Sequence, residues 1–214
     1  KGKFLLGIGS QVKAHIEKRF GVDFSPPAPR MREYILALKA IFDCWQNGTA
    51  LNFQGEYFRH TLMTPMFNPG PLDCKPPPVL LGALGPLMTE VAGEVADGLI
   101  VHPFNSMPFL VDHALPAVHR GLAKSGRERS DFILQINAII ITGDTDEARA
   151  AATASVKSLL GFYASTPAYR PPMDAVGYGD LQPELNRLCK EGRWDELGSY
   201  IDETFLDAFA TSGK

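Results

Sequence analysis

Short runs of apolar residues alternate along the chain with longer stretches in which apolar residues recur every three or four positions. The apolar runs have the length of buried strands and lie at residues 4–9, 79–83, 99–101 and 132–142. The periodic stretches predict amphipathic helices at residues 30–47, 86 to about 95, 106–124 and 148–163. Apolar strands that alternate with helices predict an α/β fold with a parallel sheet and helical crossovers.

Two segments between the first two strands have turn and loop signals. Ser25-Pro26-Pro27-Ala28-Pro29 predicts a loop or linker, because proline is unfavourable inside a helix. Residues 51–53 and 57–59 flank Gln54-Gly55-Glu56, which predicts a small hairpin, and the Pro- and Gly-rich residues 65–78 predict a long excursion.

The last third of the chain predicts helices. Asp144 and Glu147 resemble a capping box that opens the helix at 148–163. After Pro171 the sequence predicts two polar helices, at 181–191 and 196–209, and no further strand before a loop-like end.

Composition narrows the class of protein. Of the 214 residues, 45% are hydrophobic and 21% are charged, as in ordinary globular proteins. The net charge of −3 gives no basic stripe, so neither a nucleic acid nor an anionic membrane surface is an expected partner. Three widely spaced cysteines form no disulfide framework and favour the cytoplasm. Because the chain lacks an initiator Met and ends in a loop-like stretch, we expect a single partial domain, residues 1–214, truncated at both ends.

Glycines follow the first apolar run. Gly7-Ile8-Gly9-Ser10-Gln11-Val12 invites comparison with a dinucleotide-binding loop, but Val12 stands where that motif has its third glycine. The incomplete motif still has one physical consequence. Two glycines at the end of a strand let the backbone approach a ligand closely.

A second glycine turn, formed by Gly82, Ala83, Leu84, Gly85 and Pro86, runs from a strand directly into a helix. The free N–H groups and the positive dipole end of that helix suit a phosphate. A tight turn without a ligand explains the same residues equally well.

The candidates for side-chain chemistry are few. None of the five histidines has metal-ligand spacing, and no nucleophile elbow is present, so no metal and no catalytic residue is predicted. His102 closes the third apolar run ahead of Pro103, which would place it at the mouth of a parallel barrel. It is either a ligand contact or a structural histidine.

Five stretches together resemble the luciferase-like monooxygenase superfamily, in particular its branch of F420-dependent oxidoreductases. They are residues 3–9, Arg30-Met31-Arg32-Glu33, Phe53 to Phe58, Pro77 to Pro86 and Ala92 to Leu99. The resemblance runs from residue 3 to about 209. It implies a (β/α)₈ TIM barrel, here a partial barrel that covers about strands four to seven, without strands one to three and eight.

The resemblance also implies a function. It suggests hydride transfer between the deazaflavin cofactor F420 and a small organic substrate, in a protein that is a homo-oligomer when full length. The turn from Gly82 to Met88 would hold the cofactor phosphate, Gly9, Ser10 and Gln11 would line the cofactor, and His102 would lie at the active-site mouth.

Two alternatives remain. The first is an FMN-dependent monooxygenase of the same superfamily, which the sequence does not separate from the F420 enzyme. The second is a non-catalytic cofactor-binding or interaction protein on a degenerate barrel.

Overall fold

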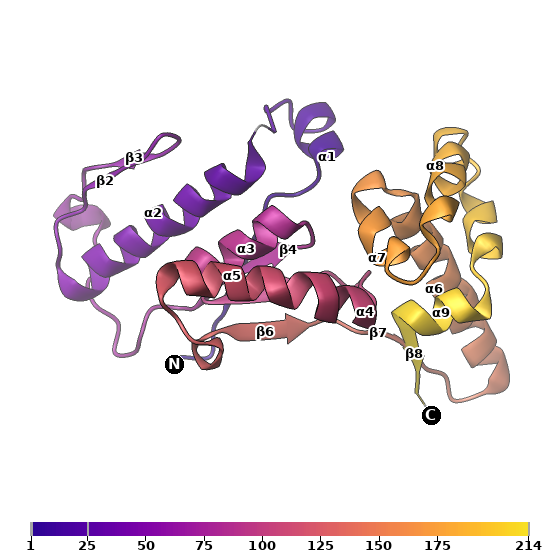
Figure 1. Cartoon of the computed structure of the whole chain (residues 1–214). Coiled ribbons are helices and arrows are strands. Elements are labelled where there is room, and N and C mark those ends of the chain that lie inside the picture. The colour runs from indigo at the N-terminus through magenta and orange to yellow at the C-terminus, as the bar shows by residue number, and fades with distance from the viewer. Residues whose placement is uncertain (1, 25, 214) are drawn as a thin grey trace. The chain divides into compact units, whose positions relative to one another are not determined.

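The computed structural model of the chain describes residues 2–24 and 26–213 (Figure 1). Residue contacts divide these into two compact units. The first unit comprises the chain up to Ile100 together with Ala117–Gln135, and the second comprises Val101–Pro116 together with the chain from Ile136 onward. Each unit has its own sheet and its own core.

A four-stranded sheet with the order β1-β4-β5-β6 forms the centre of the first unit. Its strands are β1 (Leu6–Gly9), β4 (Val79–Ala83), β5 (Gly98–Val101) and β6 (Ile133–Ile136). β1 and β4 pair in parallel, with Leu6 opposite Val79 and Gly9 opposite Gly82. The crossovers from β4 to β5 and from β5 to β6 pass through helices, as parallel neighbours require. The prediction of an α/β fold with helical crossovers is confirmed.

Helices pack on this sheet and on one another. α2 (Pro27–Asn47) and α3 (Pro86–Val95) are joined by Arg32, whose guanidinium donates to the Glu94 carboxylate at 2.7 Å. The residues of β4 from Val79 to Leu81 are fully buried, because this central strand is covered by other elements. α5 (Leu115–Ser125) begins in the second unit and continues into the first.

The remaining elements of the first unit are short. They are α1 (Lys13–Lys18), the antiparallel hairpin β2 (Phe53–Gln54) and β3 (Arg59–His60), and the 3-10 turns Pro65–Phe67 and Arg129–Asp131. The hairpin confirms the prediction made for residues 51–59.

The second unit is mainly helical around an apolar core. Its helices are α4 (Met107–Phe109), the π-helical turn Leu110–Ala114, α6 (Asp146–Ser165), α7 (Arg170–Asp174), α8 (Gln182–Lys190) and α9 (Glu203–Phe209). 3-10 turns lie at Pro167–Tyr169, Gly179–Leu181 and Trp194–Tyr200. Leu160, Leu185, Leu188 and Phe205 are fully buried in this core, so the amphipathic faces of α6, α8 and α9 point inward.

Two predicted helix starts are wrong. α2 begins at Pro27, inside the segment predicted as a loop, because the first helical residues have no intrahelical acceptor for their N–H groups and proline loses nothing there. Ser25 of that segment lies outside the described residues. The N-cap of α6 is Thr145, whose side chain accepts from the Ala148 N–H, in place of the predicted Asp144 box.

The predicted strand at 132–142 is divided. It forms β6 in the first unit and β7 (Ile139–Ile141) in the second, and β7 pairs in parallel with β8 (Ala210–Ser212). β8 corrects the prediction that no strand follows Pro171; three partly polar residues are too few to show strand periodicity. The predicted helix at 196–209 is likewise broken, since its first part is the 3-10 turn Trp194–Tyr200.

Candidate functional site

The two glycine segments predicted to contact a ligand lie next to each other. Gly9 and Gly82 are register partners at the carboxyl ends of β1 and β4. Ligands of parallel α/β proteins bind at this end of the strands. Since neither glycine has a side chain, a ligand can approach the backbone closely at these carboxyl ends of the strands.

The turn after β4 leads into the N-terminus of α3. Gly85 is the N-cap, it is exposed, and no side-chain hydrogen bond caps this end of the helix. Pro86 has no N–H, so the uncapped donors of the first turn are the N–H groups of Leu87 and Met88. A Cβ built on Gly85 would meet no atom within 4 Å, which leaves open space beside these donors. This arrangement fits an anionic group such as a phosphate.

The loop after β1 has an unusual backbone. Gln11 has φ of +58°, a left-handed conformation that side chains other than Gly and Asn seldom adopt. Its side-chain Oε1 lies 3.3 Å from His15 Nδ1, and the Ser10 hydroxyl donates to the Gln11 carbonyl. Strain of this kind is concentrated at functional sites, which agrees with the prediction for Ser10 and Gln11 without testing it.

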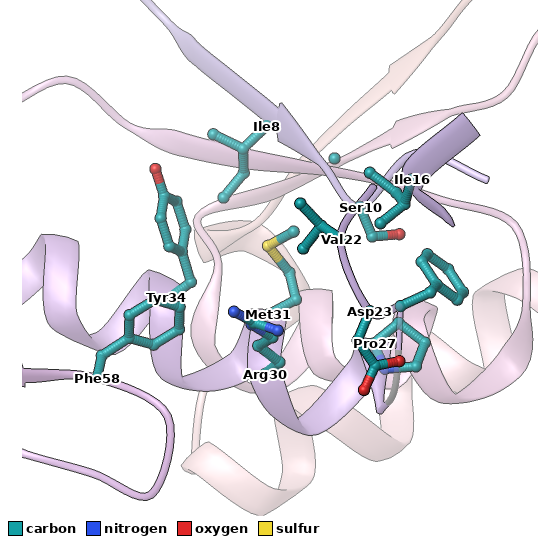
Figure 2. A pocket seen from close by; sticks show the side chains of 12 residues that line it. Ile8, Ser10, Ile16, Val22, Asp23, Pro27, Arg30, Met31, Tyr34 and Phe58 are labelled. Atoms are coloured by element: carbon teal, nitrogen blue, oxygen red, sulfur yellow. The ribbon is translucent and has the colours of Figure 1, made fainter. Parts of the chain in front are cut away.

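A pocket of about 410 Å³ opens beside Gly9 and Ser10, between β1, α1 and α2 (Figure 2). This volume is within the usual range for small-molecule sites. The walls are mainly apolar and are formed by Ile8, Ile16, Val22, Met31, Tyr34 and Phe58. The charged residues of the lining are Asp23 and Arg30. We call this cavity the β1 pocket.

Phe58 reaches the β1 pocket because Glu33 holds the hairpin. The Glu33 carboxylate accepts the backbone N–H groups of Glu56 at 2.7 Å, Tyr57 at 2.8 Å and Phe58 at 3.2 Å. Partial burial acts to raise the pKa of Glu33, but the three N–H donors outweigh it, so the net pKa lies below its usual value. A side chain at Gly55 would collide with this carboxylate, which explains the glycine in the hairpin.

Both partners of this contact lie in stretches that carry the family resemblance, but nothing in the sequence pairs them. Arg30-Met31-Arg32-Glu33 and Phe53 to Phe58 are separate stretches of that resemblance. Their pairing is a long-range contact, to which periodicity within one element gives no access.

His102 belongs to the second unit. Its ring packs against the rings of Tyr163 and Tyr169, with centroids 5.1 and 4.6 Å away. The Phe104 backbone N–H donates to Nδ1 at 3.1 Å, so the neutral ring carries its proton on Nε2. Burial lowers the pKa of His102, which favours this neutral form.

Over the described part of the chain, no group of three or more His, Cys, Asp or Glu residues could hold a metal ion. Among the same residues, no helix is long and apolar enough to cross a membrane.

Comparison with known proteins identifies the family. The sequence model described as luciferase-like monooxygenase matches residues 1–214. The chain belongs to this family. The luciferase-like assignment agrees with the five sequence motifs, and it covers both compact units.

Relatives of this luciferase-like chain are longer than it is. The uncharacterized protein Rv1360 of Mycobacterium tuberculosis is 47% identical over 213 residues, which are 100% of this chain and 63% of that protein. The 5,10-methylenetetrahydromethanopterin reductase of Archaeoglobus fulgidus is 28% identical, over 99% of this chain and 60% of its own length. The chain thus spans less than two thirds of the length of these relatives.

A solved structure shows the same fold. The coenzyme F420-dependent tetrahydromethanopterin reductase of Methanopyrus kandleri aligns with a TM-score of 0.72 and 21% identity, over 96% of this chain and 60% of that one. This likeness confirms the prediction of a partial (β/α)₈ barrel for the luciferase-like chain.

Proposed function

We propose that the chain is the main part of an oxidoreductase that transfers a hydride between the cofactor F420 and a small organic substrate. The observation that carries this proposal is the uncapped turn from Gly82 to Pro86 beside Gly9, at the carboxyl ends of two parallel strands. Relatives named as F420-dependent enzymes support the choice of cofactor. Family membership alone would also allow reduced FMN and a monooxygenase reaction.

The proposed roles follow from position. The N–H groups at the start of α3 would bind the cofactor phosphate, and the bare backbone at Gly9 and Gly82 would allow its ring system to approach the sheet. Ser10 and Gln11 would border the ring, with the Gln11 side chain oriented by its contact to His15 Nδ1. When bound, the cofactor supplies the hydride chemistry, and the protein supplies orientation and exclusion of water.

His102 would act as a neutral contact at the active-site mouth. Its Nε2–H is the ring's available donor, since Nδ1 already accepts from the Phe104 N–H. We further propose that the protein works in the cytoplasm as a homo-oligomer, with the small-molecule substrate as its partner.

A paired titration tests the cofactor. The chain is titrated with F420 and, separately, with FMN, and binding is followed by the fluorescence anisotropy of each cofactor. We expect saturable binding of F420 and markedly weaker binding of FMN. Preferential retention of FMN would favour the monooxygenase, and binding of neither would contradict the proposal for this chain.

A further inference from the structure

The β1 pocket has features that the cofactor roles above do not use. Its lining includes Gly9 and Ser10 but none of the turn residues from Gly82 to Pro86. It is closed on one side by α2 and by Phe58 from the hairpin, which the cofactor proposal does not involve. Gly9 and Ser10 are shared with the proposed cofactor site, so the pocket borders that site, and the rest of its lining is available to a second ligand.

Two aromatic rings form one wall of this pocket. The rings of Tyr34 and Phe58 meet edge to face with centroids 5.6 Å apart. Figure 2 shows both on the same side of the pocket, with Met31 and Val22 beside each other nearer its centre. A flat apolar group can pack against such a wall, because ring contacts and apolar burial both favour it.

One positively charged side chain, that of Arg30, lies at this aromatic wall. The guanidinium carbon of Arg30 lies 5.9 Å from the centroid of the Phe58 ring. Among the described residues Arg30 forms no ion pair with a carboxylate, whereas Asp23, the acidic residue of the lining, already takes part in an interaction of its own. The planar guanidinium therefore keeps its donors for a carboxylate, sulfonate or phosphate of a ligand.

We propose that the β1 pocket binds the substrate, and that the substrate is an apolar, ring-containing molecule with one anionic group. The ring packs on Tyr34 and Phe58, and the anionic group pairs with Arg30. Glu33 is a positioning residue for this site, because its three hydrogen bonds to the hairpin place Phe58 in the wall. The identity of the occupant as substrate rests on the proposed function, whereas the preference for an apolar anion does not.

Two fluorescent probes that differ in one charged group test the pocket. 8-Anilinonaphthalene-1-sulfonate carries the sulfonate, and N-phenyl-1-naphthylamine has the same rings without it. We expect Arg30→Gln to weaken binding of the sulfonate about fivefold, the upper range for an exposed charge pair, and to leave the neutral probe within about twofold. Phe58→Leu should weaken both probes by a similar factor.

A control variant outside the pocket lining shows whether the probes bind in the pocket. Met66 is 89% exposed on the excursion after the hairpin, away from the pocket lining, so Met66→Gln should change neither affinity. An unchanged affinity of the sulfonate in Arg30→Gln, or loss of binding in Met66→Gln, would overturn the proposal. Displacement of the sulfonate by F420 would also overturn it, because the pocket would then belong to the cofactor. If F420 does not bind at all while the probe results hold, the proposed function fails and the pocket's preference stands.

Discussion

At the scale of single residues, Gly85 is a position where the requirements of folding and of ligand binding differ. Its φ of −67° is available to any residue, and a Cβ there meets no neighbour within 4 Å. Nothing in the packing of α3 therefore requires glycine at this position. A ligand that approaches the helix start would require it, because any side chain would project into the same space.

Gly85→Asp tests this difference directly. Aspartate is a favourable N-cap, so the free energy of unfolding should be unchanged or should rise by about 0.3 kcal/mol. The same carboxylate would occupy the N–H groups and repel a phosphate, so F420 affinity should fall by about tenfold or more, about 1.4 kcal/mol. Gly85→Ala is the steric control. Equal F420 affinity in the wild type and Gly85→Asp would exclude the helix start as the phosphate site.

His102 makes the second unit sensitive to acid. Burial lowers its pKa in the folded state, so below the unfolded-state value of about 6.5 the unfolded chain binds more protons. The free energy of unfolding should therefore decrease as the pH falls from 7.5 towards about 5, with neutral conditions as the stable side.

His102→Asn removes the titration and keeps an acceptor for the Phe104 N–H. Urea unfolding of this variant should show a smaller loss of stability between neutral and acidic pH than the wild type shows. His119→Gln is the matched control, because His119 is an exposed helix residue. If His102→Asn keeps the full pH dependence, burial of the His102 ring is not its source.

At the scale of elements, the contact between α2 and the hairpin depends on one carboxylate. Glu33 is the acceptor for three consecutive backbone N–H groups, which a two-residue hairpin strand pair could not otherwise satisfy. Glu33→Ala should free the hairpin from α2 while α2 itself remains helical.

Amide hydrogen exchange measures this release. The amides of Tyr57 and Phe58 should exchange many times faster in Glu33→Ala, whereas the amides of α2 should keep their protection. Glu17→Gln is the control, since Glu17 pairs with Lys13 on exposed α1 and is not among the residues that hold the hairpin. Because the pKa of Glu33 is lowered, the hairpin should stay fastened at neutral pH and be released as the pH falls below the usual range for Glu. Unchanged exchange in Glu33→Ala would mean that other contacts hold the hairpin.

The elements that the sequence predicts well are those with strong local patterns. The apolar run at 79–83 is β4 to the residue, and the periodicity from Met31 to Trp45 lies within α2. The predictions fail where local chemistry permits two outcomes: proline at 27 and 29 suits a helix start as well as a loop. β8 and the Glu33 contact depend on partners far away in the chain, so no local pattern could show them.

The same difference between local patterns and long-range contacts applies to the candidate site. The Gly82–Pro86 turn and the glycines after β1 are visible in the sequence, since strand ends and glycine turns are local features. Their juxtaposition through the Gly9–Gly82 register, and the β1 pocket with Phe58 in its wall, required the structure.

At the scale of the whole molecule, residue contacts divide the chain into two compact units, and the single domain that the sequence predicts stays a prediction that unfolding experiments can test. Each unit has its own buried core: residues Val79 to Leu81 of β4 are fully buried in the first, and Leu160 of α6 with Leu185 and Leu188 of α8 are fully buried in the second. Units with separate cores can unfold separately, whereas a single domain of two-state behaviour unfolds as one.

The two tryptophans of the chain report on the two units separately. Trp45 lies on α2 in the first unit, and Trp194 lies in the second, where its ring contacts Phe162 at 6.1 Å between centroids. In urea, Trp194→Phe leaves Trp45 as the probe of the first unit, and Trp45→Phe leaves Trp194 as the probe of the second. We expect two transitions with different midpoints, and a far-UV circular dichroism curve of the wild type that follows their sum. Because loss of either core need not expose the other, each transition should also have a smaller urea dependence than expected for 214 residues that unfold together. Coincident midpoints with the full urea dependence would instead favour the single partial barrel domain that the sequence predicts.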